Sequence, residues 1–315
     1  SRTSLLLNPG YIQHLYQEKD AEYMRFLDDF YQIASGCEAI VLNPGIDLVH
    51  PEFLSRYFKA QVKCLHHIDD PHLTYNFSTP FAWAFDCASY ISKTYNEDLL
   101  MKQFLANIGL SNSFWLPLTH FSGSDLSEST ILQSWQSRKA HSIYIGNEYS
   151  SKSRHISQLR YLLGNQFKIY GSYKFFGLPF AFSNFDYLWR HPILPNRISN
   201  RERTSFYLSS TVGFNIHISY PRRRECGNAR TYELAAHGVA QVVDNVGISE
   251  HPIFTQNEVL TYQDINEAAE IIQYLLNHPS KAQEYGLAAY SRFHSTYSPV
   301  RIYSKFFNWL SSFKN

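Results

Sequence analysis

Short apolar runs alternate with helical stretches along almost the whole chain, and this alternation restricts the fold more than any other feature. In the first half, the predicted strands are 4–7, 39–42, 62–68 and 87–91, and the predicted helices are 23–34, 51–58 and 97–108. In the second half, the predicted strands are 142–146, 167–170, 212–216, 240–243 and 259–262, and the predicted helices are 151–163, 201–209, 229–237, 265–276 and 300–310. Strands that are apolar at every position are typical of a parallel sheet covered by helices on both faces. The sequence therefore predicts an α/β protein.

The alternation lapses once, between about residues 121 and 140, where Ser, Gly, Gln and Asp predominate. Such a stretch is typical of a linker, or of a surface helix, between two domains. A chain of 315 residues is long enough for two ordinary domains. We therefore predict one domain over residues 1–138, a second over 139–298, and a final helical segment over 299–315.

Composition and charge exclude several classes of protein. Apolar residues make up 44% of the chain and charged residues 17%, which excludes a disordered polyampholyte. The 28 Lys and Arg residues nearly balance the 27 Asp and Glu residues, so a general electrostatic attraction to nucleic acid is not expected. No apolar run reaches the roughly 18 to 20 residues that cross a bilayer, so no transmembrane segment is predicted. The four cysteines form no C-x-x-C pair, which indicates reduced thiols of a cytoplasmic protein and no structural zinc site.

The polar residues with the clearest chemistry follow the predicted strand 212–216, because parallel sheets bind ligands at the carboxyl ends of their strands. Asn228 is suited to cap the helix that begins at Ala229, and the free N–H groups there, with Arg230 in the first turn, predict a phosphate or diphosphate site. Glu233 lies three residues further on the same face and could accept hydrogen bonds from ribose hydroxyls. The alternative is an ordinary surface helix with an N-cap and one ion pair.

Three stretches of the second half resemble a known family; they are Gly213–His217, Asn228–Gly238 and Gln241–Asn245. The family is that of the bacterial glycosyltransferases of the CgeB, or spore-maturation, type, which belong to the glycosyltransferase group 1-type proteins of the GT-B superfamily. The resemblance covers roughly residues 142–297. It is weaker in the first half, where the matching pieces are His67–Pro71 and Phe114–Leu118.

This resemblance implies the GT-B fold, in which two Rossmann-like, doubly wound parallel-sheet domains face a central cleft. The first domain would hold the acceptor and the second the nucleotide-sugar donor, and the final helix would cross back to the first domain. The donor-binding residues expected on this basis are Gly146, Asn147, Asn215, His217, Asn228, Arg230, Glu233 and Asp244. Within this set, Arg230 would hold the diphosphate and Glu233 the ribose. No cofactor and no metal ion are expected, since GT-B enzymes do not rely on an Asp-x-Asp metal site.

A base for the acceptor hydroxyl is expected at the end of the predicted strand 62–68, where the candidates are His67, Asp69 and Asp70. The sequence does not decide among them, and a turn in which the aspartates cap backbone N–H groups is the alternative. Glu225 and Glu233 have the Glu-x7-Glu spacing of many retaining GT-B enzymes. A retaining route needs no acceptor base, so both stereochemical outcomes stay open.

The resulting expectation is a metal-independent glycosyltransferase. It would move a sugar from a nucleotide-diphosphate sugar to a hydroxyl of a carbohydrate, lipid-linked or protein acceptor, namely a cell-surface polysaccharide, a glycolipid or a protein. Nucleic acid is not expected as a partner, while peripheral membrane association is compatible with the sequence. The alternatives are a nucleotide-sugar epimerase or hydrolase of the same fold, and a catalytically silent nucleotide-sugar-binding subunit.

Overall fold

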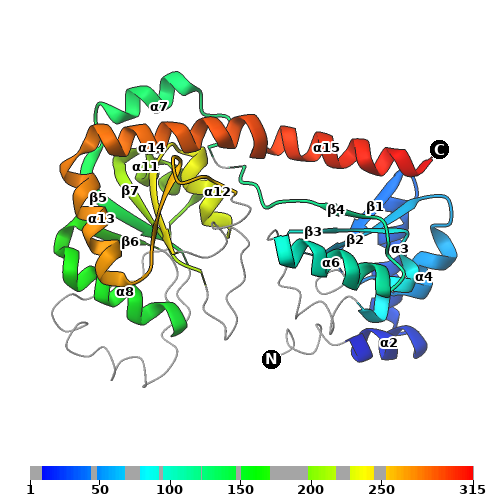
Figure 1. Cartoon of the computed structure of the whole chain (residues 1–315). Helices are drawn as coiled ribbons and strands as arrows, with labels where there is room; N and C mark the ends of the chain where they lie inside the picture. The colour runs from blue at the N-terminus through cyan, green and yellow to red at the C-terminus, as the bar shows by residue number, and fades with distance from the viewer. Residues whose placement is uncertain are drawn as a thin grey trace. The chain divides into compact units, whose positions relative to one another are not determined.

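A computed structural model describes residues 9–43, 48–67, 79–91, 95–121, 123–146, 150–170, 198–217, 228–244 and 253–314 (Figure 1). The chain divides into two compact units, each with its own parallel sheet. The first unit consists of residues 1–117 with 303–315, and the second of residues 118–302. The segment 118–138, which the sequence analysis assigned to the first domain, thus belongs to the second unit.

The first unit contains a four-stranded sheet with the order β1-β2-β3-β4. Its strands are β1 (Ala39–Leu42), β2 (Val62–His67), β3 (Cys87–Tyr90) and β4 (Ser113–Trp115), and every neighbouring pair is parallel. Its helices are α2 (Pro9–Gln17), α3 (Ala21–Ala34), α4 (Pro51–Tyr57) and α6 (Tyr95–Asn107), with the 3-10 helix η1 (Thr79–Ala84). Leu27, Leu54 and Leu65 are at most 1% exposed and lie in its core. The predicted strand 4–7 lies outside the described residues.

The second unit contains a five-stranded parallel sheet with the order β6-β5-β7-β8-β9. Its strands are β5 (Lys139–Ile145), β6 (Phe167–Tyr170), β7 (Ser210–Asn215), β8 (Ala240–Asp244) and β9 (Val259–Tyr262). Its helices are α7 (Glu128–Trp135), α8 (Ser150–Leu163), α11 (Asn200–Ser209), α12 (Ala229–Ala236), α13 (Ile265–Asn277) and α14 (Pro279–Arg292). The chain order reverses between β5 and β7, which is the topological switch point of a doubly wound sheet.

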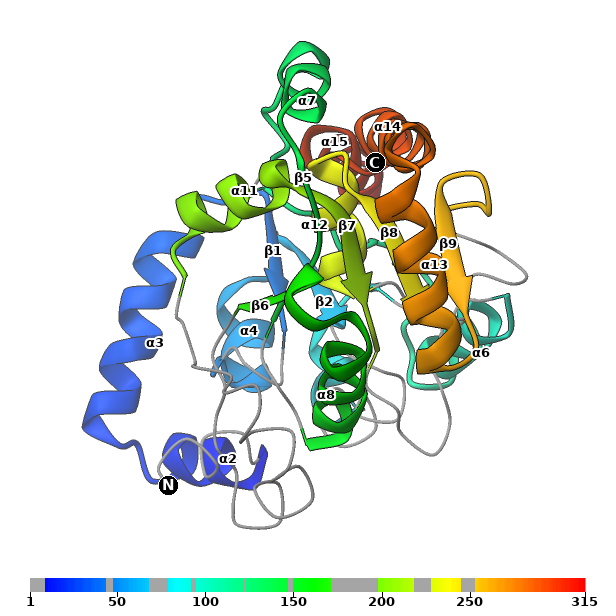
Figure 2. The same cartoon turned by 90° about the vertical axis from the view of Figure 1, so that its left-hand side faces the viewer.

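Separate cores cover the two faces of the second sheet. On one face, Tyr144, Val212 and Phe214 pack with the apolar sides of α8 and α13, which lie toward the viewer in Figure 2. On the other face, Ile145 and Leu234 belong to a core that includes residues of α11 and α12. Side chains point alternately to the two faces along each strand, as the pleat requires.

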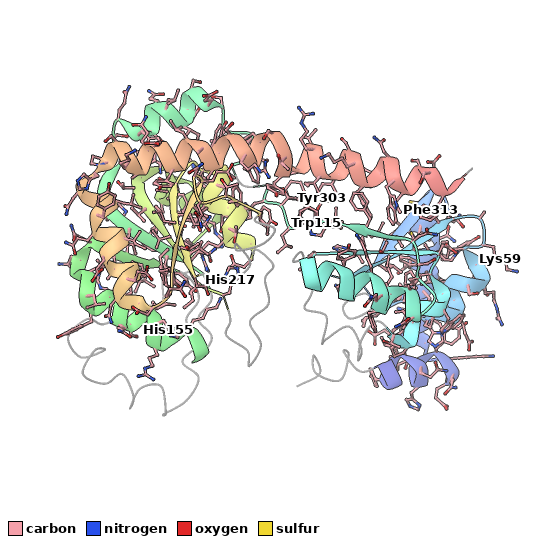
Figure 3. All side chains as sticks on the ribbon, in the orientation of Figure 1. Lys59, Trp115, His155, His217, Tyr303 and Phe313 are labelled. Atoms are coloured by element: carbon pink, nitrogen blue, oxygen red, sulfur yellow. The ribbon has the colours of Figure 1, made fainter. Side chains whose placement is uncertain are left out.

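The final helix α15 (Pro299–Ser311) begins in the second unit and continues into the first. Its second half packs against β4, because the ring of Phe114 lies 5.7 Å from that of Phe306 and 5.1 Å from that of Trp309. Trp115 and Tyr303 are labelled on these two elements in Figure 3. Burial of such large rings contributes strongly to stability.

The structure differs from the sequence-based prediction at three elements. No helix was predicted between the strand 4–7 and the helix 23–34, whereas Pro9 begins helix α2; the missing N–H of proline costs nothing in the first helical turn. Helix α14 begins in the same way at Pro279 and was not predicted. Strand β4 was missed because it has only three residues, too few to show a pattern.

Helix α14 packs without a gap against the turn that ends α12. Gly238 follows α12 with φ of 58°, and a Cβ at Gly286 would overlap the carbonyl oxygen of Gly238. The same Cβ would lie 2.8 Å from Cζ2 of Trp135. The position of α12 in the second unit therefore depends on close backbone contact at Gly286.

We expect Gly286→Ala to lower the free energy of unfolding by about 1–3 kcal/mol, because the added methyl must displace backbone rather than a flexible side chain. Urea denaturation monitored by tryptophan fluorescence would measure the change. Gly36→Ala is the control, since a Cβ at Gly36 meets nothing within 4 Å. Equal midpoints for the two variants would contradict this account of the packing.

Candidate functional site at the carboxyl ends of β5, β7 and β8

Helix α12 is buried along nearly its whole length and points its first turn at the carboxyl end of the sheet. Residues from Arg230 to Ala236 are all buried, so the surface-helix alternative is wrong. The Asn228 side chain caps the helix by accepting a hydrogen bond of 3.1 Å from the N–H of Thr231, as predicted from the sequence. The partial positive charge of this helix end therefore faces the edge where parallel sheets bind ligands.

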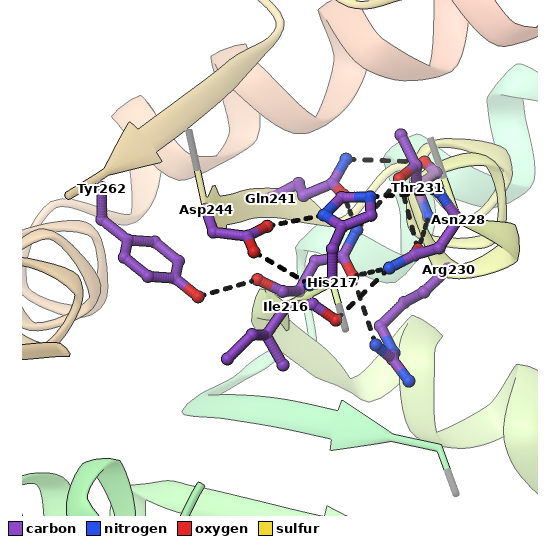
Figure 4. A network of polar contacts seen from close by, with 9 residues as sticks. Ile216, His217, Asn228, Arg230, Thr231, Gln241, Asp244 and Tyr262 are labelled. Atoms are coloured by element: carbon purple, nitrogen blue, oxygen red, sulfur yellow. Dashed lines mark hydrogen bonds and ion pairs between the residues drawn. The ribbon is translucent and has the colours of Figure 1, made fainter. Parts of the chain in front are cut away.

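Arg230 extends across the end of the sheet, between β5 and β7 (Figure 4). Its Nε donates to the carbonyl of Ile145 at 2.8 Å, and its Nη1 donates to Oδ1 of Asn215 at 3.2 Å. The guanidinium carbon lies 4.2 Å from the ring centre of Tyr144, which is part of the core on the opposite face from α12. Arg230 is only 9% exposed to solvent. Within the described part of the chain, its guanidinium forms no ion pair with a carboxylate.

Gly146 leaves the space that this arginine occupies. A Cβ at Gly146 would collide with Nη2 of Arg230 and lie 3.2 Å from the Tyr144 hydroxyl oxygen. The position immediately after β5 must therefore lack a side chain if the guanidinium is to lie at the switch point. Gly146 was predicted as a donor-site residue; the structure places it directly against Arg230, while Asn147 lies outside the described residues.

A second cation lies near Arg230. Lys152, in the first turn of α8, is buried, and burial together with the charge of Arg230 lowers its pKa to about 8, although Asp244 acts in the opposite direction. Two buried cationic side chains in the same region favour the binding of an anion there. Sequence reasoning missed Lys152, because a single lysine in a Ser-rich helix start carries no recognisable pattern.

Asn215 is completely buried, and all four of its hydrogen-bonding positions are used. Its Nδ2 donates to Oγ1 of Thr231 and to Oε1 of Gln241, and its Oδ1 accepts from Nδ2 of Asn228 and from Arg230. The predicted donor-site residue Asn215 thus lies in the site, but its side chain holds other residues. Gln241, which the sequence analysis did not single out, belongs to the same network.

His217 and Asp244 form a pair at the ends of β7 and β8; His217 is labelled in Figure 3. The His217 Nδ1 lies 2.6 Å from Oδ1 of Asp244, and the His217 backbone N–H donates to Oδ2 of Asp244 at 3.0 Å. On the other side of the ring, Nε2 accepts a hydrogen bond of 3.2 Å from the backbone N–H of Asn228. This ring therefore joins β7 and β8 to the start of α12.

Glu233 lies on α12 one turn beyond Arg230, where it faces α11. Its Oε1 accepts from Nη1 of Arg203 at 2.9 Å and lies 3.4 Å from Nε2 of His120, and its Oε2 accepts from the Tyr207 hydroxyl at 3.0 Å. The residue is 3% exposed. These contacts hold α11 and the segment before α7 against α12, and the predicted contact of Glu233 with ribose stays a prediction.

The predicted acceptor-side residues lie in the first unit. His67 is the last residue of β2, at the carboxyl end of that sheet, and its neighbour His66 contacts the Ser89 hydroxyl through Nδ1 at 2.8 Å. Asp69 and Asp70 lie outside the described residues, as does Glu225. Among the described residues, no three His, Cys, Asp or Glu side chains gather as a metal-binding group. None of the described helices is long and apolar enough to span a membrane.

Residues 152–308 match the glycosyl transferase-like family. Solved structures with this fold include an α-glucosyltransferase in complex with UDP-glucose and DNA containing an abasic site, at 11% identity and a TM-score of 0.63 over 90% of this chain and 83% of the other. The matches support a GT-B glycosyltransferase. No curated protein matches the chain.

Two further solved structures share the fold of this glycosyltransferase-like chain. Anabaena HepE in complex with UDP is 12% identical, with a TM-score of 0.62 over 91% of this chain and 82% of that one. The sucrose-phosphate synthase of Thermosynechococcus elongatus is 13% identical, with a TM-score of 0.63 over 94% of this chain and 79% of that one. At these identities the likeness shows the GT-B fold, with its two Rossmann-like domains, and the predicted fold class is confirmed.

The buried carboxylate of Glu233 provides a test of the site's architecture. We expect Glu233→Gln to lower the free energy of unfolding by about 2 kcal/mol, because Arg203 then loses its charged partner next to a buried amide. The control is Glu284→Gln, which alters an exposed pair with Lys281 and should leave stability essentially unchanged. Differential scanning calorimetry of both variants measures the difference, and similar losses for the two would contradict the proposed role of Glu233.

Proposed function

We propose that this chain transfers a sugar from a nucleoside-diphosphate sugar, bound by the second unit, to a hydroxyl group of an acceptor bound by the first. The observation that carries the proposal is the position of Arg230 at the switch point of a doubly wound sheet, without a carboxylate partner among the described residues and close to the buried Lys152. The match of residues 152–308 to a glycosyl transferase-like family supports the same activity.

The diphosphate is the group of the donor that this site fits best. Its negative charges would neutralise Arg230 and Lys152, and the N-terminal end of α12 adds a partial positive charge in the same direction. When the bond between sugar and phosphate breaks, negative charge grows on the leaving diphosphate. Cationic groups already in position stabilise that charge without rearrangement, which is a main source of catalysis in such sites.

Uridine is our choice for the nucleoside, because two of the solved structures with this fold contain UDP or UDP-glucose. We further propose that the reaction needs no metal ion, since two side-chain cations supply the charge that a divalent ion would otherwise contribute. The acceptor is proposed to be a carbohydrate, a lipid-linked sugar or a protein hydroxyl. His67, Asp69 and Asp70 remain the proposed sources of a base for it. Membership of the CgeB-type subfamily is likewise a proposal.

The proposal predicts that UDP, or GDP or dTDP, raises the melting temperature of the protein and that Arg230→Ala abolishes the increase. Arg154→Ala is the matched control, because Arg154 is an exposed arginine in α8 and its removal changes the net charge equally. Differential scanning fluorimetry measures both effects. If no nucleotide in this panel shifts the melting temperature of the unmodified protein, the donor site is not where we place it.

Product analysis then separates transfer from the other activities that this fold could support. Incubation of the bound nucleotide sugar with a panel of carbohydrate, lipid-linked and peptide acceptors should yield a glycosylated acceptor. Conversion of the sugar without an acceptor would instead identify an epimerase or a hydrolase. Binding without turnover across the panel would identify a silent nucleotide-sugar-binding subunit.

Lys152 makes nucleotide binding depend on pH in a defined direction. The free protein has a Lys152 pKa of about 8, and a bound diphosphate raises it, because the anion favours the charged ammonium group. Below pH 7 the lysine is already charged, so pH changes there have little effect through this group. Above pH 8 the free protein loses the proton and must take it up again on binding, so the nucleotide affinity falls by up to about tenfold per pH unit.

Isothermal titration calorimetry at pH 8.5, in two buffers with different ionisation enthalpies, measures this proton uptake. We expect uptake in the unmodified protein and none through this group in Lys152→Arg, whose guanidinium stays charged throughout. The Lys152→Arg variant also corrects for protons that the nucleotide itself binds. Equal proton uptake by the two proteins would show that Lys152 does not contact the diphosphate.

A further inference from the structure

Gln241 is a fully buried polar residue in the middle of the second sheet. It lies in β8 between two apolar neighbours, Ala240 and Val242, and its side chain faces α12 rather than the core formed with α8 and α13. Its Oε1 accepts a hydrogen bond of 2.9 Å from Asn215, and its Nε2 donates to the backbone carbonyl of Thr231 at 3.4 Å. Burying an amide is costly unless its hydrogen bonds are made, so the residue type at this position needs an explanation.

The backbone carbonyl of Thr231 fixes the orientation of the Gln241 amide. A carbonyl oxygen can only accept, so Gln241 must turn its Nε2 toward Thr231 and its Oε1 toward Asn215. Asn215 must then present its Nδ2 to Gln241, which leaves its Oδ1 facing Arg230 and Asn228; Figure 4 labels these three partners. Both of those neighbours are donors, and the orientation of the Asn215 amide therefore matches them.

The Thr231 hydroxyl cannot set this direction by itself. Its Oγ1 accepts from Asn215 and lies 3.3 Å from the capping oxygen of Asn228. A hydroxyl group both donates and accepts, so it can partner either orientation of the Asn215 amide. Two members of the network have a polarity tied to the backbone: Gln241 through the Thr231 carbonyl, and Asn228 through the Thr231 N–H and the Ile216 carbonyl. Gln241 acts on the Nδ2 side of Asn215, and Asn228 acts on its Oδ1 side.

We propose that Gln241 is a positioning residue for the donor diphosphate. Together with Asn228, it holds the Asn215 amide in one orientation, and through this amide it holds the guanidinium of Arg230 at the end of β5. With the amide reversed, the Asn215 NH2 group would face the guanidinium and the Asn228 amide, and neither donor would have its acceptor. Arg230 would then lose the contact that places Nη1, although its charge would remain.

This inference rests on the proposed function, because it assigns Gln241 a role in binding the same diphosphate. It differs from a purely structural role in what it predicts for affinity. A strand residue that only stabilises the fold changes the melting temperature, whereas a residue that acts through Arg230 changes nucleotide affinity only as long as Arg230 is present.

The test is a double-mutant cycle on the full chain, with the nucleoside diphosphate that binds the unmodified protein, UDP first, as the probe. Gln241→Met keeps the length of the side chain and removes both hydrogen bonds, and we expect it to weaken binding about tenfold. In an Arg230→Lys background the same change should cost less than about twofold, because lysine cannot make the Nη1 contact. Titration calorimetry gives the four dissociation constants.

Thr211→Val is the control for loss of a buried hydrogen bond on β7. Thr211 is 3% exposed, and its hydroxyl donates to the carbonyl of Lys139 at 2.8 Å, at the opposite end of the strand from Asn215. We expect its nucleotide affinity to match that of the unmodified protein. If Gln241→Met lowers the nucleotide affinity equally in the unmodified and the Arg230→Lys backgrounds, the inference is overturned. If neither Arg230→Lys nor Arg230→Ala lowers the nucleotide affinity, the proposed function itself is refuted.

Asn215→Asp supplies a second test that does not require Gln241→Met to be stable alone. A carboxylate presents oxygen in both directions, so in this variant Oε1 of Gln241 faces another acceptor. Gln241→Met should then raise the melting temperature and the UDP affinity of Asn215→Asp, the reverse of its effect on the unmodified protein. A further decrease in both quantities would contradict the polarity argument.

Discussion

The site depends on one contact: the guanidinium of Arg230 lies across the carboxyl end of the second sheet, between β5 and β7. The strand order reverses there, and Gly146 leaves room for the guanidinium at the end of β5 because it has no side chain. Arg230 starts from α12 on one face and reaches the ring of Tyr144 in the core of the other. Sheet topology and one glycine thus bring a buried positive charge to the ligand-binding edge.

The electrostatics of this edge are unusual for a protein interior. Buried charges are normally paired with opposite charges, because desolvation is expensive. At the opposite, amino end of β5, Arg138 shows one solution, since its guanidinium donates to the carbonyls of Ser210 and His237 while burial lowers its pKa to about 9. Arg230 is likewise held by a carbonyl and an amide rather than by a carboxylate, but it lies near Lys152, whose pKa is also lowered. Two cationic side chains at one edge of the sheet favour the binding of an anionic ligand.

Helix α12 serves both the site and the fold. Arg230 and the Asn228 cap at its start face the ligand edge, whereas Glu233 at its middle holds Arg203 and Tyr207 of α11. At its far end, the turn at Gly238 packs directly on α14. The helix is therefore supported along its length by contacts that do not involve a ligand, which keeps its first turn rigid. Rigid placement of charged groups is what electrostatic stabilisation of a leaving group requires.

The alternation of apolar strands and helices was enough to predict the α/β class, both sheets and most element positions. Local chemistry likewise predicted Asn228 as the cap of α12, because a helix start depends on a few consecutive residues. The short strand β4 and the helices that begin at Pro9 and Pro279 were not predicted from local pattern. Their signals are too short, or resemble turns.

The sequence by itself thus determined where strands end and which polar residues follow them, since those properties are local. Only the tertiary structure decided which side chains meet: that Asn215 holds Arg230, that Gln241 orients Asn215, and that Lys152 lies near the guanidinium. These contacts join residues far apart in the chain. They exist because the order β6-β5-β7-β8-β9 places the ends of particular strands side by side, and the strand order is set by how whole helices cover the two faces of the sheet.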